Sequence, residues 1–250
     1  MKKLAALLFL ATILGSCSYI LDLNRTGDDK IIKLDWNGAT NIEIWAPCQM
    51  TLINSNTTGI EIEGMDFIVD GYEITQTEDE LIIEHENTSS LQEKKMADIR
   101  LSAPDFETIT YNAAGHLLNE DTLTVDQFKI VVNGKGIYTT SNLTLKGNSL
   151  TLYVYGGINK SEHKLSGIVN KASYTMEGGT DIDAINLKTQ TTNINHKSYG
   201  NIYVDAEEYL NAQIYSTGNI YYTGQPTISF EIIENTIMDA SGQLLLYSGK

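Results

Sequence analysis

The four residues Gly-Asn-Ile-Tyr occur twice, at the start of "GNIYVDA" (residues 200–206) and of "GNIYYTG" (residues 218–224). Each copy follows a polar, strand-like stretch, and the copies begin 18 residues apart. Glycine accepts backbone conformations that other residues avoid, so it suits a sharp bend. The isoleucine that follows is expected to return to an apolar interior. The pair therefore predicts one structural corner that the chain makes more than once.

The same corner recurs throughout the second half of the chain. An apolar residue follows a glycine or small-residue turn at intervals of 18 to 24 residues, at Leu117, Ile137, Ile158, Ile182, Ile202, Ile220 and Leu244. A period near twenty residues is typical of a solenoid, in which each coil buries its apolar face against its neighbours. The repeats therefore predict an all-β protein whose residues 99–250 form a right-handed parallel β-helix-like solenoid of about seven coils. A β-sandwich with evenly spaced hairpins is the competing architecture, but it does not explain the recurring glycine.

Short strands are expected before the solenoid, over residues 31–98. Stretches such as "NIEIWA" and "LIIEHE" alternate apolar and polar residues, and polar or glycine-containing breaks separate them. No segment shows a sustained helical stripe. This pattern favours antiparallel hairpins or a small sheet. We expect this region to pack with the solenoid as one domain.

The chain begins with "MKKLAALLFLATILGSC", which has the features of a secretory signal. Its apolar run of eleven residues is too short to span a bilayer of ~30 Å as a helix. Its last four residues resemble a bacterial lipobox. We therefore expect a lipoprotein signal peptide at residues 1–16, a lipidated Cys17, and a tether that completes residues 17–30. Ser18 resembles the residue that directs lipoproteins to the outer membrane. The domain could face either the periplasm or the cell exterior.

Composition excludes several classes of function. The chain has 32 Asp and Glu residues against 17 Lys and Arg residues, for a net charge of −15, so we expect no nucleic-acid partner. Once Cys17 is lipidated, Cys48 is the only cysteine left. A single thiol forms neither an internal disulfide nor a zinc ribbon, so Cys48 is expected to be a small buried residue.

Several phrases together carry a resemblance to a known family. They are the lipobox, "IRLSAPDFETI" (residues 99–109), the corners "NGKGI", "YGGI", "GGTDI", "SYGNI" and "STGNI", and "YYTGQP" (residues 221–226). Their order and spacing resemble the "putative auto-transporter adhesin, head GIN domain" family over residues 30–245. Lys135 and Thr180 depart from it, since they stand where the other corners have glycine. The resemblance implies a β-helical domain outside the cytoplasm and brings no catalytic activity with it.

The residues that flank the repeated apolar position are the candidate ligand-binding residues. Alternation points them outward, and they include Tyr138, Tyr203, Tyr221, Asn201, Asn219, Asp181 and Asp183. Tyr203 and Tyr221 fall on adjacent coils, ~4.8 Å apart if the coils stack. These side chains could bind a glycan or a protein. Alternatively, a tyrosine stack and an asparagine ladder only stabilise the outer face of the solenoid.

Catalysis finds little support in the sequence. A carbohydrate-active enzyme on a β-helix needs clustered carboxylates with a cation or base along one groove, whereas Asp181 and Asp183 are a lone pair. The four histidines lack metal-ligand spacing, and no nucleophile or nucleotide motif is present. We therefore expect no enzyme, no metal and no cofactor.

The sequence as a whole favours a lipid-anchored envelope protein with a binding role. It would be held to the membrane by its N-terminal lipid and would present a face of the solenoid for adhesion or binding to a glycan or a protein. Two alternatives remain open, namely a β-helix polysaccharide lyase or hydrolase and a purely structural envelope component.

Overall fold

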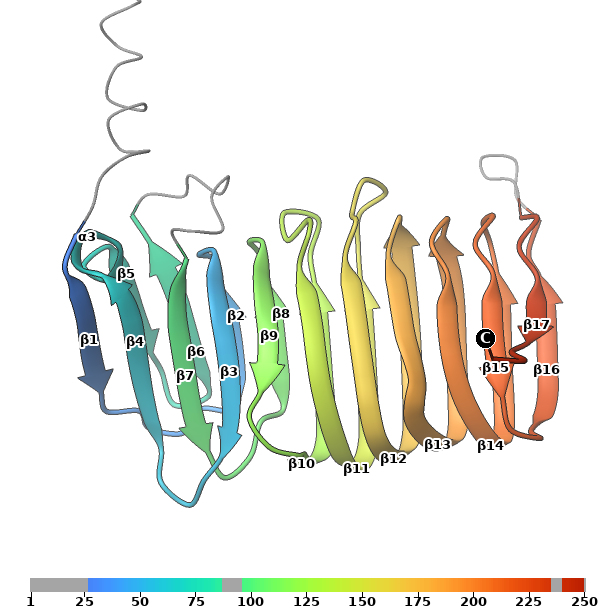
Figure 1. The fold of residues 1–250 in the computed structure, drawn as a ribbon, viewed down its shortest axis with the longest axis horizontal. Helices are drawn as coiled ribbons and strands as arrows, with labels where there is room; N and C mark the ends of the chain where they lie inside the picture. The colour runs from blue at the N-terminus through green and yellow to red at the C-terminus, as the bar shows by residue number, and fades with distance from the viewer. Residues whose placement is uncertain (1–26, 87–95, 235–239, 250) are drawn as a thin grey trace, which may run out of the picture.

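The computed structural model describes residues 27–86, 96–234 and 240–249. The expected signal peptide, Cys17 and most of the expected tether lie outside the described residues. The described part is nearly all-β, with a solenoid of about six turns preceded by short strands (Figure 1). The predicted fold class is confirmed, with slightly fewer coils than the seven expected.

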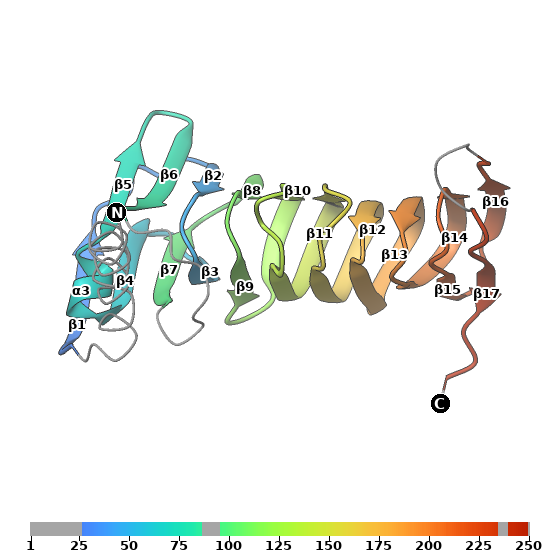
Figure 2. The ribbon, with the colours of Figure 1, turned by 90° about the horizontal axis from the view of Figure 1, so that it is seen from above.

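The solenoid proper consists of parallel strands that follow one another along its axis (Figures 1 and 2). They are β10 (Leu123–Val132), β11 (Thr140–Val154), β12 (Glu162–Gly178), β13 (Asp181–Ser198), β14 (Ile202–Ile214), β15 (Ile220–Thr223), β16 (Thr227–Ile232) and β17 (Leu244–Leu246). Consecutive coils pair in parallel, as β11 does with β12 and β12 with β13. Each coil therefore lays two limbs side by side with the same limbs of its neighbours.

A bend separates the first limb of each coil from the second. In β12 this bend contains Gly167, which adopts a left-handed conformation with φ of +107°. A Cβ atom at Gly167 would lie 2.0 Å from the carbonyl oxygen of Leu145 on the preceding coil. Only glycine meets both constraints, because other residues clash at this distance and avoid this backbone conformation. A second turn, which we call the corner, joins the second limb of one coil to the first limb of the next.

The strand register confirms part of the predicted alignment and corrects the rest. Ile182 pairs with Ile202, Ile202 with Ile220, and Ile220 with Leu244, as the repeats predicted. Leu117, however, pairs with Ser141, Ser141 with His163, and His163 with Ile182. Ile137 and Ile158 were therefore the wrong residues for this interior column, and Ile158 lies 80% exposed in a corner.

This interior column is not apolar throughout, because it contains one buried pair of polar side chains. Ser141 and His163 are both buried, and Ser141 Oγ lies 2.8 Å from His163 Nδ1. This hydrogen bond satisfies the Ser141 hydroxyl and the Nδ1 atom of His163 inside the solenoid. The two corners that precede these residues are long, spanning residues 133–139 and 155–161, and they carry Ile137 and Ile158 out of register.

The N-terminal strands extend the solenoid and then close its end. They are β1 (Asp29–Leu34), β2 (Asn41–Ile44), β3 (Cys48–Asn54), β4 (Gly59–Met65), β5 (Tyr72–Gln76), β6 (Glu80–His85), β7 (Ala97–Ala103), β8 (Thr108–Tyr111) and β9 (Gly115–Asn119), with the short helix α3 (Asp66–Val69). Strands β2 and β3 pair in parallel with β6 and β7 on one side and with β8 and β9 on the other. The coils thus do not stack in chain order.

Antiparallel hairpins, one of the two arrangements that the sequence favoured for residues 31–98, account for only part of the pairing in this region. Antiparallel pairing joins β1 to β4, β4 to β7, and β5 to β6. Because antiparallel strands interrupt the parallel ladder, they cover the end of the stack, where the last coil would otherwise expose its interior.

One continuous apolar core runs along the solenoid between the two limbs. Its largest fully buried side chains include Tyr111, Tyr174, Phe106 and Phe128. Cys48 is a free, buried cysteine, as predicted, and burial raises the pKa of its thiol to about 12. No helix within the described residues is long and apolar enough to cross a membrane.

Candidate binding surfaces

A ladder of polar side chains connects the first limbs of the later coils. The side-chain oxygen of Asp181 accepts the backbone N–H of Asn201 at 2.7 Å. Asn201 does the same for Asn219 at 3.0 Å, and Asn219 for Gln243 at 2.9 Å. The predicted contact between Asn201 and Asn219 is therefore present. Its geometry ties each side chain to the next coil, which stabilises the stack and holds the outer sheet rigid.

Three tyrosines gather beside this ladder, and we call them the tyrosine cluster. The rings of Tyr203 and Tyr221 stack with centroids 4.7 Å apart and an interplanar angle of 9°. The ring of Tyr247 meets Tyr203 edge-on at 5.6 Å. Partial burial and the neighbouring Tyr221 hydroxyl raise the pKa of Tyr203, so its hydroxyl stays protonated at neutral pH. The cluster therefore presents the neutral hydroxyl group of Tyr203 together with ring edges.

The two candidate aspartates border the tyrosine cluster. Asp183 pairs in register with Tyr203, and Asp181 begins the same strand. Both aspartates are exposed, and on the preceding coil Lys164 is the register partner of Asp183. This outer sheet thus carries tyrosine hydroxyls, carboxylates, amides and an ammonium group, which can donate and accept several hydrogen bonds.

Tyr138 does not join the other candidate tyrosines. It lies in the corner before β11 rather than on a strand, and it is 63% exposed. It is also the one described non-glycine residue with positive φ, at +66°. A tyrosine in this conformation is strained by about 1 kcal/mol or more, so the corner holds its ring out at a cost to stability.

The exposed apolar side chains of the corners were missed by sequence reasoning. They are Trp45, Tyr138, Tyr155, Ile158 and Tyr199, and we call this set the corner ridge. All five lie in turns that join a second limb to the next first limb, along the upper edge of the solenoid in Figure 1. Only the unequal lengths of the corner segments hinted at them, because a corner longer than its neighbours must leave residues outside the repeat.

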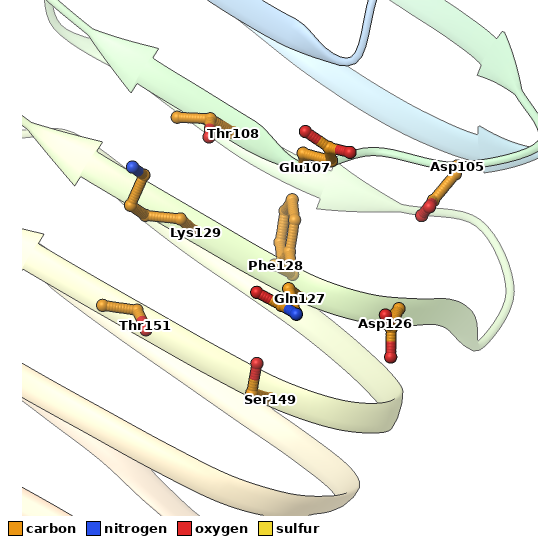
Figure 3. A pocket seen from close by; sticks show the side chains of 9 residues that line it. All are labelled: Asp105, Glu107, Thr108, Asp126, Gln127, Phe128, Lys129, Ser149 and Thr151. Carbon is orange, nitrogen blue, oxygen red and sulfur yellow. The ribbon is translucent and has the colours of Figure 1, made fainter.

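A groove of about 390 Å³ lies on the opposite side of the coils, over the second limbs. Figure 3 shows the side chains that line it, which come from the segment before β8 and from β8, β10 and β11; they are Asp105, Glu107, Thr108, Asp126, Gln127, Phe128, Lys129, Ser149 and Thr151. Carboxylates, hydroxyls and one ammonium group can bind a polar ligand here. The groove includes neither of the aspartates predicted from the sequence.

No group of His, Cys, Asp and Glu within the described residues is arranged to hold a metal ion. Two histidines instead lie inside the core. Burial lowers the pKa of His163 to about 3 and that of His196 to about 4, so both are neutral at physiological pH. The Nε2 atom of each has no hydrogen-bond partner.

The fold and these surfaces define a class, that of a β-solenoid with exposed polar and aromatic faces. The family described as "Putative auto-transporter adhesin, head GIN domain" matches residues 39–226. The chain belongs to this family, which confirms the resemblance seen in the sequence. A comparison with curated proteins finds no match.

Solved structures share the fold at low sequence identity. A protein described as a putative adhesin from Bacteroides fragilis is 20% identical, with a TM-score of 0.75 over 89% of this chain and 98% of that one. One described as a putative lipid binding protein from Parabacteroides distasonis is 17% identical, with a TM-score of 0.66 over the same shares. A putative adhesin from Parabacteroides merdae is 15% identical, with a TM-score of 0.64, again over the same shares.

Proposed function

We propose that the chain is a non-catalytic, lipid-anchored envelope protein that binds a glycan or a protein through the outer sheet of its solenoid. The family and its relatives described as adhesins support a binding role at the cell surface. Cys17 would carry the lipid and hold the protein to the outer membrane. The domain would then face either the periplasm or the exterior.

The observation that carries this proposal is the tyrosine cluster together with its flanking aspartates. Tyr203, Tyr221 and Tyr247 converge on a sheet that the polar ladder holds in place. A preorganised surface loses little conformational entropy when it binds, so modest contacts suffice for recognition. Asp183 and the tyrosine hydroxyls supply the directional hydrogen bonds that a sugar or a peptide backbone would accept and donate.

The stacking also limits how this surface can bind. Because Tyr203 and Tyr221 cover each other's ring faces, a sugar ring cannot stack between them. The ligand would instead lie across the ring edges and hydroxyls. This mode predicts hydrogen-bonded recognition, with Asp183 and Lys164 as polar contacts on the neighbouring coils.

A glycan array tests the proposal. The mature protein without its acyl group would be compared with Tyr203→Ala and Tyr221→Ala, with Tyr209→Ala as the matched control. Tyr209 is 51% exposed but lies on a second limb, away from the cluster. Binding that falls in the first two variants and persists in the control would support the proposal. Equal signals from all four proteins would refute a role for the tyrosine cluster in glycan binding, and pull-down with candidate surface proteins would then test the protein ligand in the same way.

The groove over the second limbs favours one alternative, a polysaccharide lyase or hydrolase. It brings Glu107 and Asp126 together with Lys129, and such chemistry uses carboxylates and a base along one groove. Incubation of the protein with acidic and neutral polysaccharides, followed by a reducing-end assay, tests this function. Product that disappears in Glu107→Gln would establish catalysis and would contradict the non-catalytic proposal.

A further inference from the structure

We infer that the corner ridge is a membrane-contact surface, which lays the solenoid along an anionic lipid bilayer. This inference goes beyond the proposed ligand binding and does not depend on it, because the tyrosine cluster lies on a first-limb sheet and the ridge lies on the corners. It rests on three features of the ridge, namely its shape, its side chains and its charge.

The ridge is straight because corners stack as the strands do. From the corner of Trp45 to the corner of Tyr199 there are five coil steps, which span about 24 Å at the spacing of paired strands. The corners form an outer edge of the solenoid rather than a groove (Figures 1 and 2). A straight convex edge can touch a flat surface along its whole length, whereas a glycan chain or peptide is better held by a concavity.

The side chains of the ridge are those that favour the boundary between water and lipid. Ile158 is 80% exposed and is purely aliphatic, so it offers nothing to a sugar hydroxyl but would be stabilised among acyl chains. Tyr138 and Tyr199 are 63% and 60% exposed, and tyrosine and tryptophan prefer the headgroup region of a bilayer. Tyr138 also has the strained, left-handed backbone described above, and its ring is exposed there.

The charge of the corners is opposite to that of the chain as a whole. Among the described residues of the corner segments from β2 to β15, the charged side chains are Lys135, Lys160 and Glu86, which directly follows β6. Lys135 also lies over the ring of Trp45, with Nζ 5.7 Å from the ring centroid. Carboxylates of the adjoining strands also contact corner residues. Glu43 accepts the ring N–H of Trp45 at 2.9 Å, Glu177 accepts the backbone N–H of Gly156, and Asp181 accepts that of Asn201. In a chain of net charge −15, Lys135 and Lys160 are the corner side chains that can contact lipid phosphates.

A vesicle-binding experiment tests this inference with the mature chain carrying Cys17→Ser, so that no acyl group contributes. Vesicles of phosphatidylcholine alone would be compared with vesicles that contain one quarter phosphatidylglycerol, by flotation. We expect binding to the anionic vesicles that weakens with salt. Ile158→Ser should lower the partition coefficient about tenfold, and Lys135→Gln and Lys160→Gln about fivefold each.

Matched controls come from the opposite edge of the solenoid. Ile168 is 52% exposed and Lys146 is exposed, and both lie beside the bend between limbs. Ile168→Ser and Lys146→Gln should leave vesicle binding unchanged. Trp36 is buried, so a blue shift of tryptophan emission on binding would report Trp45 entering the interface.

Three results would overturn the inference. They are an absence of binding to either vesicle, equal losses in the ridge variants and their controls, or a loss of glycan or protein binding in the ridge variants without vesicle binding. The last result would assign the ridge to that other partner.

Discussion

The buried histidine of the first-limb column should make the protein lose stability in mild acid. His163 is 1% exposed, and it pairs with Ser141 on one neighbouring coil and with Ile182 on the other. Burial lowers its pKa to about 3 from an ordinary value of 6.5. Below pH 6.5 the unfolded chain therefore binds a proton that the folded chain does not bind, and the free energy of unfolding falls. The loss proceeds from about pH 6.5 down to the pKa of the folded state.

The size of the effect follows from the distance between the two pKa values. At pH 5, which is 1.5 units below 6.5, the protonation of His163 in the unfolded chain has lowered the free energy of unfolding by about 2 kcal/mol. His196, whose pKa burial lowers to about 4, contributes a similar loss of about 2 kcal/mol. A paired substitution, His163→Leu with Ser141→Val, would replace the polar pair by apolar neighbours and remove one of these two losses.

Urea unfolding at pH 7.5 and pH 5, followed by circular dichroism, measures the effect. The variant should gain about 2 kcal/mol relative to the natural chain on going from pH 7.5 to pH 5, whatever its stability at pH 7.5. Ile182→Val is the control, because it alters the same column without changing a titratable group. It should change the free energy of unfolding by the same amount at both pH values. If the natural chain and the paired variant respond to pH in parallel, His163 is not the neutral buried group that the structure implies.

Three further predictions concern the coil geometry. Gly167→Ala should destabilise the fold by about 3 kcal/mol in urea unfolding, from a steric clash and a left-handed backbone, whereas Gly157→Ala, with open space around it, should cost under about 0.5 kcal/mol. Asn201→Ala should cost about 1 kcal/mol through the lost ladder bond, and the exposed Asn195→Ala should cost little; equal costs would argue against the ladder. Cys48 should resist a thiol reagent at pH 8 in the folded protein and react once urea unfolds it, because burial raises its pKa to about 12, and rapid labelling of the folded chain would contradict this.

The sequence predicted the solenoid because its signal is periodic. Where corners are short, as before Ile202 and Ile220, the glycine and the isoleucine keep a constant offset, and the alignment gave the correct register. A side chain after a tight corner has only one way to face the interior. The stacking of Tyr203 on Tyr221 follows from the same register, since alternation places both rings outside.

The register failed where an apolar residue was assumed to mark the interior. Ile158 and His163 are five residues apart, and a rule of burial by hydrophobicity selects the isoleucine. The structure selects the histidine, because Ser141 on the preceding coil satisfies its Nδ1 atom. Such a choice depends on a contact between residues 22 positions apart, which a single segment does not display.

The strand pairing that closes the N-terminal end could not be predicted from the sequence either. Local alternation predicts strands at β2, β3, β6 and β7, but it does not say which strand each one meets. Strand β2 pairs in parallel with β6 and with β8, so a coil formed early in the chain is enclosed by two later ones. Pairing of this kind is decided by long-range packing rather than by turn chemistry.

The exchange of Ile158 for His163 bears on function as well as on register. Folding alone favours the burial of an isoleucine and the exposure of a histidine, since the first gains hydrophobic stabilisation and the second avoids desolvation. This chain does the reverse, and it also holds Tyr138 in a strained conformation one corner away. Two neighbouring corners therefore expose apolar side chains against the preference of the fold. Strain and misplaced hydrophobic residues concentrate where a surface has a partner, which is why we assign the corner ridge, rather than the more regular sheets, to contact with a bilayer.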